Sequence, residues 1–120
     1  MTKGKVVLLP FPFDDLSATK VRPAVCLTDP IGPHRHVIVA FVTSRSLTDI
    51  LETDIVLEVS RSDFTATGLR VSSTLRLHRL MTLSTALFRR TLGELSSSMQ
   101  GEVADKLRTL FQLAGDSQHP

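Results

Sequence analysis

Short apolar segments separated by polar breaks run along the first two thirds of this chain, and they predict strands. The segments lie at residues 4–13, 23–28, 36–43, 54–59, 70–77 and 80–83. The connections between them are too short for crossover helices, so we predict a mostly antiparallel sheet. We expect this sheet to curl into a small β-barrel.

The segment at 70–77 alternates in polarity, which indicates a strand with one polar face. Arg76 and His78 stand two residues apart on the polar side of this pattern. Side chains two apart in a strand point to the same side of the sheet. We therefore expect Arg76 and His78 to lie together on that face.

The pattern changes to a helical period near residue 95. Residues 84–90 have the composition of a helical turn, and Ser97 and Gln100 are spaced as a capping box that opens a longer helix. Apolar residues then recur at helical spacing on one face: Met99, Val103, Leu107, Leu110, Phe111 and Ala114. Core packing explains that face. We predict a single domain over residues 1–114, mainly β with a C-terminal helix, and a disordered tail over 115–120.

The composition fits one soluble globular domain. The chain has 120 residues, of which 42% are hydrophobic and 22% charged, and these values argue against disorder. No apolar stretch approaches the length that spans a bilayer, and the N-terminus lacks the profile of a signal peptide. Cys26 is the single cysteine, which excludes an intramolecular disulfide and a cysteine metal cluster. We therefore predict a cytoplasmic protein outside the membrane.

Arginine dominates the basic residues. The formal net charge is only +2, but ten of the fourteen basic residues are arginine, whose planar fork suits phosphate. Five of these arginines fall within residues 70–90, where composition alone favours a solvated basic face over a binding site. The chain has no glycine-rich phosphate loop, which argues against nucleotide-driven chemistry. His34 and His36 have no Cys, Asp or Glu close by in the sequence, so we predict no metal site.

Four motifs occur in order along nearly the whole chain, at residues 4–27, 39–44, 73–83 and 92–96. In the first, an apolar strand with two prolines leads through a polar loop to Lys20, and Arg22 then stands directly before Pro23. This series resembles the PemK/MazF toxin family. The Arg-Pro motif is fairly specific by itself, and four motifs in order make the resemblance strong.

The resemblance implies a homodimeric, SH3-like barrel that is the toxin of a type II toxin–antitoxin pair. Such toxins cut single-stranded RNA without a metal or another cofactor. The ribose 2′-hydroxyl attacks the phosphate and leaves a 2′,3′-cyclic phosphate and a 5′-hydroxyl. The partner is a cognate antitoxin protein whose C-terminal segment blocks the RNA groove, and DNA binding is expected only of the toxin–antitoxin complex.

Arg22 and Thr43 match the two family positions that are usually given the chemistry. Pro23 favours an extended backbone at Arg22, which fixes the direction in which the side chain leaves the strand. Its guanidinium can then present two parallel N–H groups to a phosphate. A salt bridge from Arg22 to the polar loop at residues 14–15 is the alternative, and for Thr43 the alternative is a cap at the strand end.

The resemblance also assigns catalytic roles to the positions of Arg76 and His78. Some family members have Arg-x-Asp here, with the arginine as an acid and the aspartate as a base, so His78 is a departure. Histidine changes charge near neutral pH and can move a proton. Further RNA contacts are expected from a second set of residues: Lys20, Ser44, Arg79, Asp15 and Ser17.

Two other functions stay compatible with the sequence. The first is a PemK-like barrel that has lost catalysis and acts through its antitoxin as a DNA-associated regulatory module. The departure at His78 keeps this alternative open, while Arg22 and Thr43 weigh against it. The second is a toxin of the same barrel that poisons DNA gyrase, against which the Arg-Pro motif argues.

Overall fold

The structure of the chain is a computed structural model that describes residues 1–10 and 20–114. Its elements follow in this order: β1 (Lys5–Pro10), β2 (Val21–Cys26), β3 (His36–Thr43), β4 (Asp54–Leu57), η1 (Thr65–Thr67), β5 (Ser73–Ser84), η2 (Thr85–Leu87), β6 (Arg90–Glu94) and α1 (Ser97–Phe111). The η elements are short 3-10 helices. The predicted end of the first strand, over residues 11–13, and the predicted tail over 115–120 lie outside the described residues.

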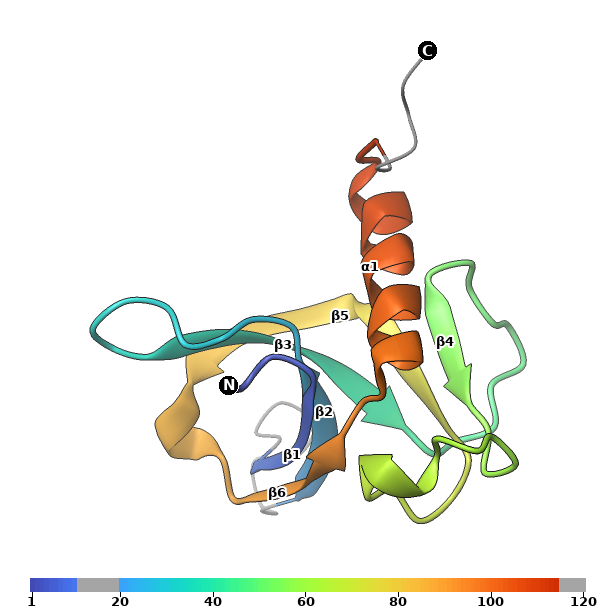
Figure 1. The fold of residues 1–120 in the computed structure, drawn as a ribbon, viewed down its shortest axis with the longest axis horizontal. Helices are drawn as coiled ribbons and strands as arrows, with labels where there is room; N and C mark the ends of the chain where they lie inside the picture. Colours follow the sequence, from blue (N-terminus) through green and yellow to red (C-terminus); the bar gives the residue numbers. More distant parts are fainter. Residues whose placement is uncertain (11–19, 115–120) are drawn as a thin grey trace.

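The six strands form one antiparallel sheet in the order β4-β5-β3-β2-β1-β6. Figure 1 shows this sheet curling into a half-barrel, with α1 rising from the end of β6 and packing against β4 and β5. The predicted antiparallel sheet, small SH3-like barrel and C-terminal helix are therefore confirmed.

The strand β5 is longer than the sequence pattern predicted. The segments at 70–77 and 80–83 were predicted as separate strands, but residues 73–84 form one. Its pairing with β3 is irregular, because the neighbours Ala40 and Phe41 pair with Leu80 and Arg76, which lie four positions apart. Leu77, His78 and Arg79 thus lie between two successive pairs and form a bulge. Such a bulge bends a strand and changes which side chains share a face.

Two apolar clusters occupy the two sides of the curled sheet. The larger cluster includes Leu75 and Leu77 of β5 and is covered by Met99 and Val103 of α1. The smaller cluster includes Phe41 of β3, together with further residues of β1, β2 and β3 and the C-terminal half of β5. Because β3 contributes alternate residues to the two clusters, it is buried on both faces, as its almost continuous apolar sequence predicted.

The sequence pattern did not predict β6. Residues 84–90 do contain a helical turn, η2, but the chain then extends and pairs with β1 at the sheet edge. Its burial does not alternate in the way that marks a strand with one buried face. Gly93 lies in this strand where it packs against η1, and there is no room for a side chain at that position.

The helix α1 begins one residue earlier than predicted. Ser96, rather than Ser97, is its N-cap, because its hydroxyl accepts the backbone N–H of Met99 at 3.0 Å. The side chain of Gln100 donates to the carbonyl of Leu95 at 3.0 Å, so it does not complete the predicted capping box. Three consecutive serines offer the same local chemistry, and the contact that distinguishes Ser96 is a 2.6 Å hydrogen bond to Asp63.

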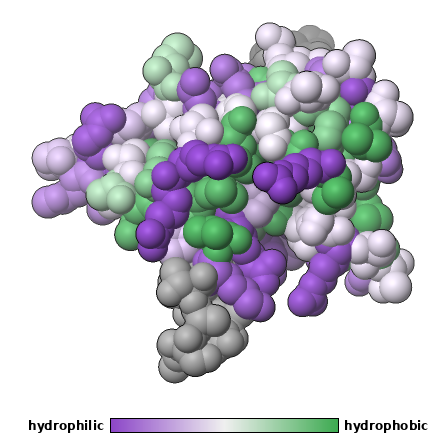
Figure 2. Space-filling model, turned by 90° about the horizontal axis from the view of Figure 1, so that it is seen from below, coloured by the Kyte–Doolittle hydropathy of each residue, from purple (hydrophilic) through white to green (hydrophobic). Residues whose placement is uncertain are grey.

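Only part of the predicted apolar face of α1 is buried. Met99 and Val103 lie in the core, but Phe111 is 55% exposed and Ala114 is exposed as well. The second half of the helix extends beyond the sheet (Figure 1). Figure 2 shows hydrophilic and hydrophobic side chains interspersed on another face of the molecule.

An ion-pair cluster ties the start of α1 to the segment between β4 and η1. The Arg61 guanidinium bonds Asp63 at 2.9 Å and Glu102 at 2.7 Å, and Asp63 also accepts the Ser96 hydroxyl. The hydrogen bonds from Arg61, and then that from Ser96, lower the pKa of Asp63 below its ordinary value. Each favours the charged form of the carboxylate.

We expect acid to weaken the fold through Asp63. Its pKa is lower in the folded than in the unfolded chain, so its contribution is complete above the ordinary pKa and is lost as the pH falls through the lowered value. The urea concentration at the unfolding midpoint of wild type should therefore decrease as the pH is lowered below about 4. In Asp63→Asn this decrease should be smaller. Asp105→Asn, at a side chain that is 79% exposed, is the control. Equal slopes for wild type and Asp63→Asn would contradict the prediction.

Candidate functional site

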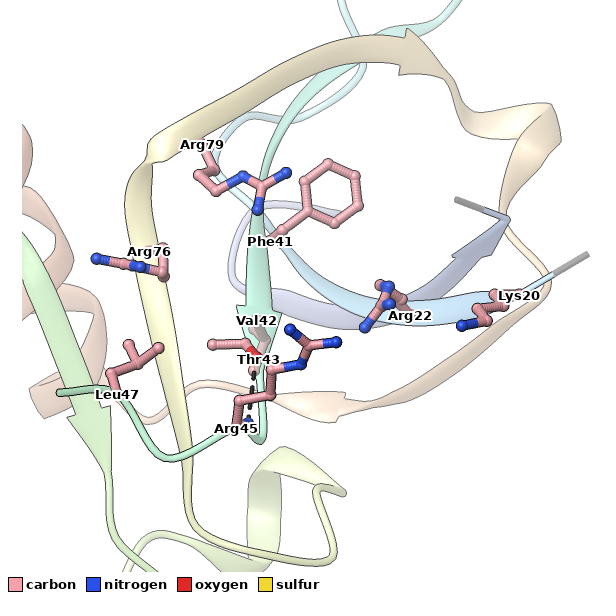
Figure 3. A pocket seen from close by; sticks show the side chains of 9 residues that line it. All are labelled: Lys20, Arg22, Phe41, Val42, Thr43, Arg45, Leu47, Arg76 and Arg79. Carbon is pink, nitrogen blue, oxygen red and sulfur yellow. Dashed lines mark hydrogen bonds between the residues drawn. The ribbon is translucent and has the colours of Figure 1, made fainter. Parts of the chain in front are cut away.

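A cavity of about 490 Å³ opens beside the smaller apolar cluster, between β2, β3, β5 and the loop that follows β3 (Figure 3). The residues that line it are Lys20, Arg22, Phe41, Val42, Thr43, Arg45, Leu47, Arg76 and Arg79. Five of these side chains are basic, and none of the described residues in this lining is acidic. Such a concentration of positive charge favours an anionic ligand.

The pairing of β2 with β3 brings Arg22 and Thr43 together. Ala24 pairs with Phe41, and the two functional candidates lie two residues further along their antiparallel strands, on the same face as that pair. The described ladder between these strands begins at Ala24, and Pro23 has no N–H to extend it. Arg22 thus lines the cavity two residues beyond the end of this ladder.

The hydroxyl of Thr43 accepts the backbone N–H of Arg45 at 3.2 Å (Figure 3). This contact supports the alternative of a cap at the strand end. It leaves the hydroxyl proton of Thr43 available as a donor, so capping and phosphate binding are compatible. The alternative salt bridge from Arg22 to residues 14–15 lies outside the described residues.

Arg76 forms a two-pronged ion pair that the sequence did not reveal. Its Nε and Nη2 donate to Oδ1 and Oδ2 of Asp54, each at 3.1 Å. The Asp54 side chain is fully buried, whereas that of Arg76 is 19% exposed at the cavity. Figure 3 shows the Arg76 guanidinium turned toward β4 and away from Arg22. A periodic pattern carries no information on this partner, because the pair joins residues 22 positions apart.

The structure places Arg76 at the cavity but not His78, the residue expected beside it. Arg79, rather than His78, lines the cavity with Arg76, and His78 is exposed. His78 and Arg79 both lie in the irregular stretch of β5, where the strict alternation of a strand need not hold. The catalytic roles of Arg76 and His78 stay predictions.

The other expected contact residues differ in their placement. Lys20 and Arg79 line the cavity, whereas Ser44 is exposed and does not. Asp15 and Ser17 lie outside the described residues. Sequence reasoning missed Phe41, Arg45 and Leu47 as lining residues. Phe41 lies in the second motif, but its apolar neighbours in the sequence indicated only a buried strand.

Other kinds of site find little support in the described residues. No group of three or more His, Cys, Asp or Glu side chains within residues 1–10 and 20–114 could hold a metal ion. Cys26 is buried, and this burial raises the pKa of its thiol to about 11, which makes it a poor nucleophile. Among the same residues, no helix has the length and apolar character needed to cross a bilayer.

The fold and the site were compared with known protein families and solved structures. A family model described as "PemK-like, MazF-like toxin of type II toxin-antitoxin system" matches residues 2–111. The chain therefore belongs to the PemK/MazF-like toxins of type II toxin–antitoxin systems. No curated protein matches it in sequence.

Solved structures share the fold at low sequence identity. The toxin MazF-mt6 of Mycobacterium tuberculosis superposes with a TM-score of 0.70 at 21% identity, over 92% of this chain and 99% of that one. A mycobacterial endoribonuclease in complex with its cognate antitoxin gives 0.70 at 16%, over 96% and 98% of the two chains. MazF in a MazE–MazF complex from Deinococcus radiodurans gives 0.66 at 20%, over 95% and 97%. These likenesses establish the fold of the chain.

Proposed function

We propose that this toxin is a metal-independent, sequence-selective endoribonuclease that cleaves single-stranded RNA. The observation that carries the proposal is the cavity with five basic side chains, in which Arg22 and Thr43 share one face. Phosphate contacts supply most of the affinity of a protein for a nucleic acid. Phe41, which is 8% exposed, contributes part of the apolar wall of the same cavity.

The chemistry that this cavity supports is internal transfer of the phosphate. The 2′-oxygen forms a bond to phosphorus as the bond to the 5′-oxygen breaks; the 2′-hydroxyl gives up its proton and the leaving 5′-oxygen takes one. Charge grows on the non-bridging oxygens in the transition state. The fork of Arg22 can bind two of these oxygens, and the Thr43 hydroxyl can donate to one. Lys20, Arg45 and Arg79 add positive charge around them.

We propose two protein partners as well. A cognate antitoxin is expected for a toxin of this family, and its acidic residues would be drawn to the same basic cavity. A second copy of the chain would cover the apolar residues that are exposed at and just beyond the end of α1, Phe111 and Leu113. Sedimentation of the purified chain should then give the mass of a dimer. Because the proposed substrate is RNA, we also propose a cytoplasmic location for the protein.

Incubation of the purified chain with a mixed-sequence RNA in excess chelator tests the proposed activity. We expect discrete fragments that end in a 2′,3′-cyclic phosphate and begin with a 5′-hydroxyl. A substrate with 2′-deoxyribose at the cut position is the control, because it lacks the nucleophile and should stay intact. Absence of cleavage, with DNA binding seen only beside an antitoxin, would support a regulatory module instead.

The exposed position of His78 predicts that it does not transfer the protons of this reaction. We expect His78→Asn to leave the pH dependence of RNA cleavage unchanged, because the side chain does not line the cavity. The measurement is kcat/KM between about pH 5 and 9, the range around the ordinary titration of histidine. If an inflection near neutrality disappears in the variant, His78 does take part and the expectation is wrong.

A further inference from the structure

Asp54 is a charged group in the interior that the proposed chemistry does not use. It is the first residue of β4, and its side chain is completely buried. Its carboxylate accepts hydrogen bonds from two residues: Oδ1 and Oδ2 accept from Arg76, and Oδ2 also accepts the backbone N–H of Leu51 at 2.8 Å. A buried carboxylate is costly unless it is paired and hydrogen-bonded, and these contacts meet that need.

The ion pair determines where the positive charge of Arg76 lies. An arginine side chain is long and flexible, but two parallel hydrogen bonds to a buried carboxylate hold its guanidinium in one plane. Nη1 has no acceptor within the described part of the chain, so its two N–H groups are available to a ligand in the cavity. The guanidinium lies on the side of β4 and Leu47, away from Arg22 and Thr43 (Figure 3).

Asp54 also holds the end of the loop that borders the cavity. Its hydrogen bond to Leu51 closes the turn before β4, and Lys106 of α1 donates to the adjacent carbonyl of Glu52 at 2.6 Å. The beginning of the same loop supplies Arg45 and Leu47 to the cavity lining. One buried carboxylate therefore fixes both Arg76 and the far end of this loop.

We propose that Asp54 is a positioning residue that holds Arg76 as a binding group for an RNA phosphate next to the one that reacts. This inference rests on the proposed function and deepens it. A proton-transferring arginine would have to reach the reacting atoms, whereas this guanidinium is held at the wall of the cavity by its Nε and Nη2. The pair thus contributes to substrate binding, with the chemical step left to other side chains.

Asp54→Asn separates binding from chemistry. The amide keeps one acceptor but loses the second, so the two-pronged pair with Arg76 cannot form. We expect KM for RNA to rise about tenfold, as for the loss of one charge-assisted hydrogen bond, with kcat unchanged within about twofold. Arg76→Lys, which keeps the charge but lacks the fork, should give the same split. Asp49→Asn, at an exposed carboxylate of the same loop, is the matched control and should change neither constant.

The dependence of Asp54 on Arg76 is tested by combining their substitutions. In an Arg76→Ala background, Asp54→Asn should raise KM no further, because the group that it positions is gone. Independent effects would indicate that Asp54 acts only on general stability, and would overturn the proposal. A fall in kcat at unchanged KM in Asp54→Asn would overturn it too, since Arg76 would then serve the chemical step.

Two readouts keep this inference separate from the proposed cleavage. Binding of a 2′-O-methyl oligonucleotide, which cannot be cut, should weaken about tenfold in Asp54→Asn. Hydrogen exchange at the Arg76 Nε–H, followed by NMR, should be slow in wild type and fast in the variant. If wild type does not cleave RNA, the proposed function fails, while equal oligonucleotide affinities or equal exchange rates overturn the positioning role of Asp54.

Discussion

We expect Arg22→Ala to abolish RNA cleavage and to leave a folded protein, which is the largest effect on activity that we predict. Arg22 shares a strand face with Thr43 through the described pairing of β2 with β3. Loss of one preorganised donor to a developing oxyanion costs on the order of 10²–10³-fold in rate. The surrounding basic side chains cannot replace its two parallel N–H groups, because each is anchored on another strand or loop.

Three variants make this measurement specific. Cleavage of a defined RNA is followed for wild type, Arg22→Ala and Arg22→Lys, and the lysine variant should recover little activity because an ammonium lacks the fork. Arg70→Ala is the matched control, since Arg70 is exposed and does not line the cavity. Circular dichroism should show the same fold for all four proteins. Full activity of Arg22→Ala would remove the main support for the proposed function.

Gly93→Ala should produce a large loss of stability. A Cβ at this position in β6 would lie 2.2 Å from the carbonyl oxygen of Ala66 and 2.5 Å from the carbonyl carbon of Thr67. Both atoms belong to the backbone around η1, which packs against β6, so neither can rotate away. The strand must separate from η1, and we expect a decrease of about 3 kcal/mol in the free energy of unfolding.

Gly101→Ala is the matched substitution with the opposite expectation. Gly101 lies inside α1, and a Cβ there would meet nothing within 4 Å. Alanine should stabilise the helix by about 0.5–1 kcal/mol, because glycine loses more backbone entropy on folding. Urea unfolding of both variants checks the pair. Equal midpoints for Gly93→Ala and wild type would show that β6 does not pack against η1 in this way.

Local patterns in the sequence predicted most of the strands but not their pairing. Apolar periodicity is a property of neighbouring residues, so it located β3 and the buried first half of α1. It could not reveal that β5 continues through a bulge, since Leu77–Arg79 are irregular only relative to the partner strand β3. The edge strand β6 shows no such periodicity, and local patterns therefore did not predict it.

For the site, the sequence by itself determined the residue types and one local geometry: an arginine directly before Pro23, an alternating strand that carries Arg76, and an excess of arginine suited to phosphate. Only the tertiary structure decided which side chains meet. The pair of Asp54 and Arg76, the entry of Arg79 in place of His78, and the part of α1 left uncovered all depend on the register between distant strands. Register is set by packing of the whole sheet, which no local pattern contains.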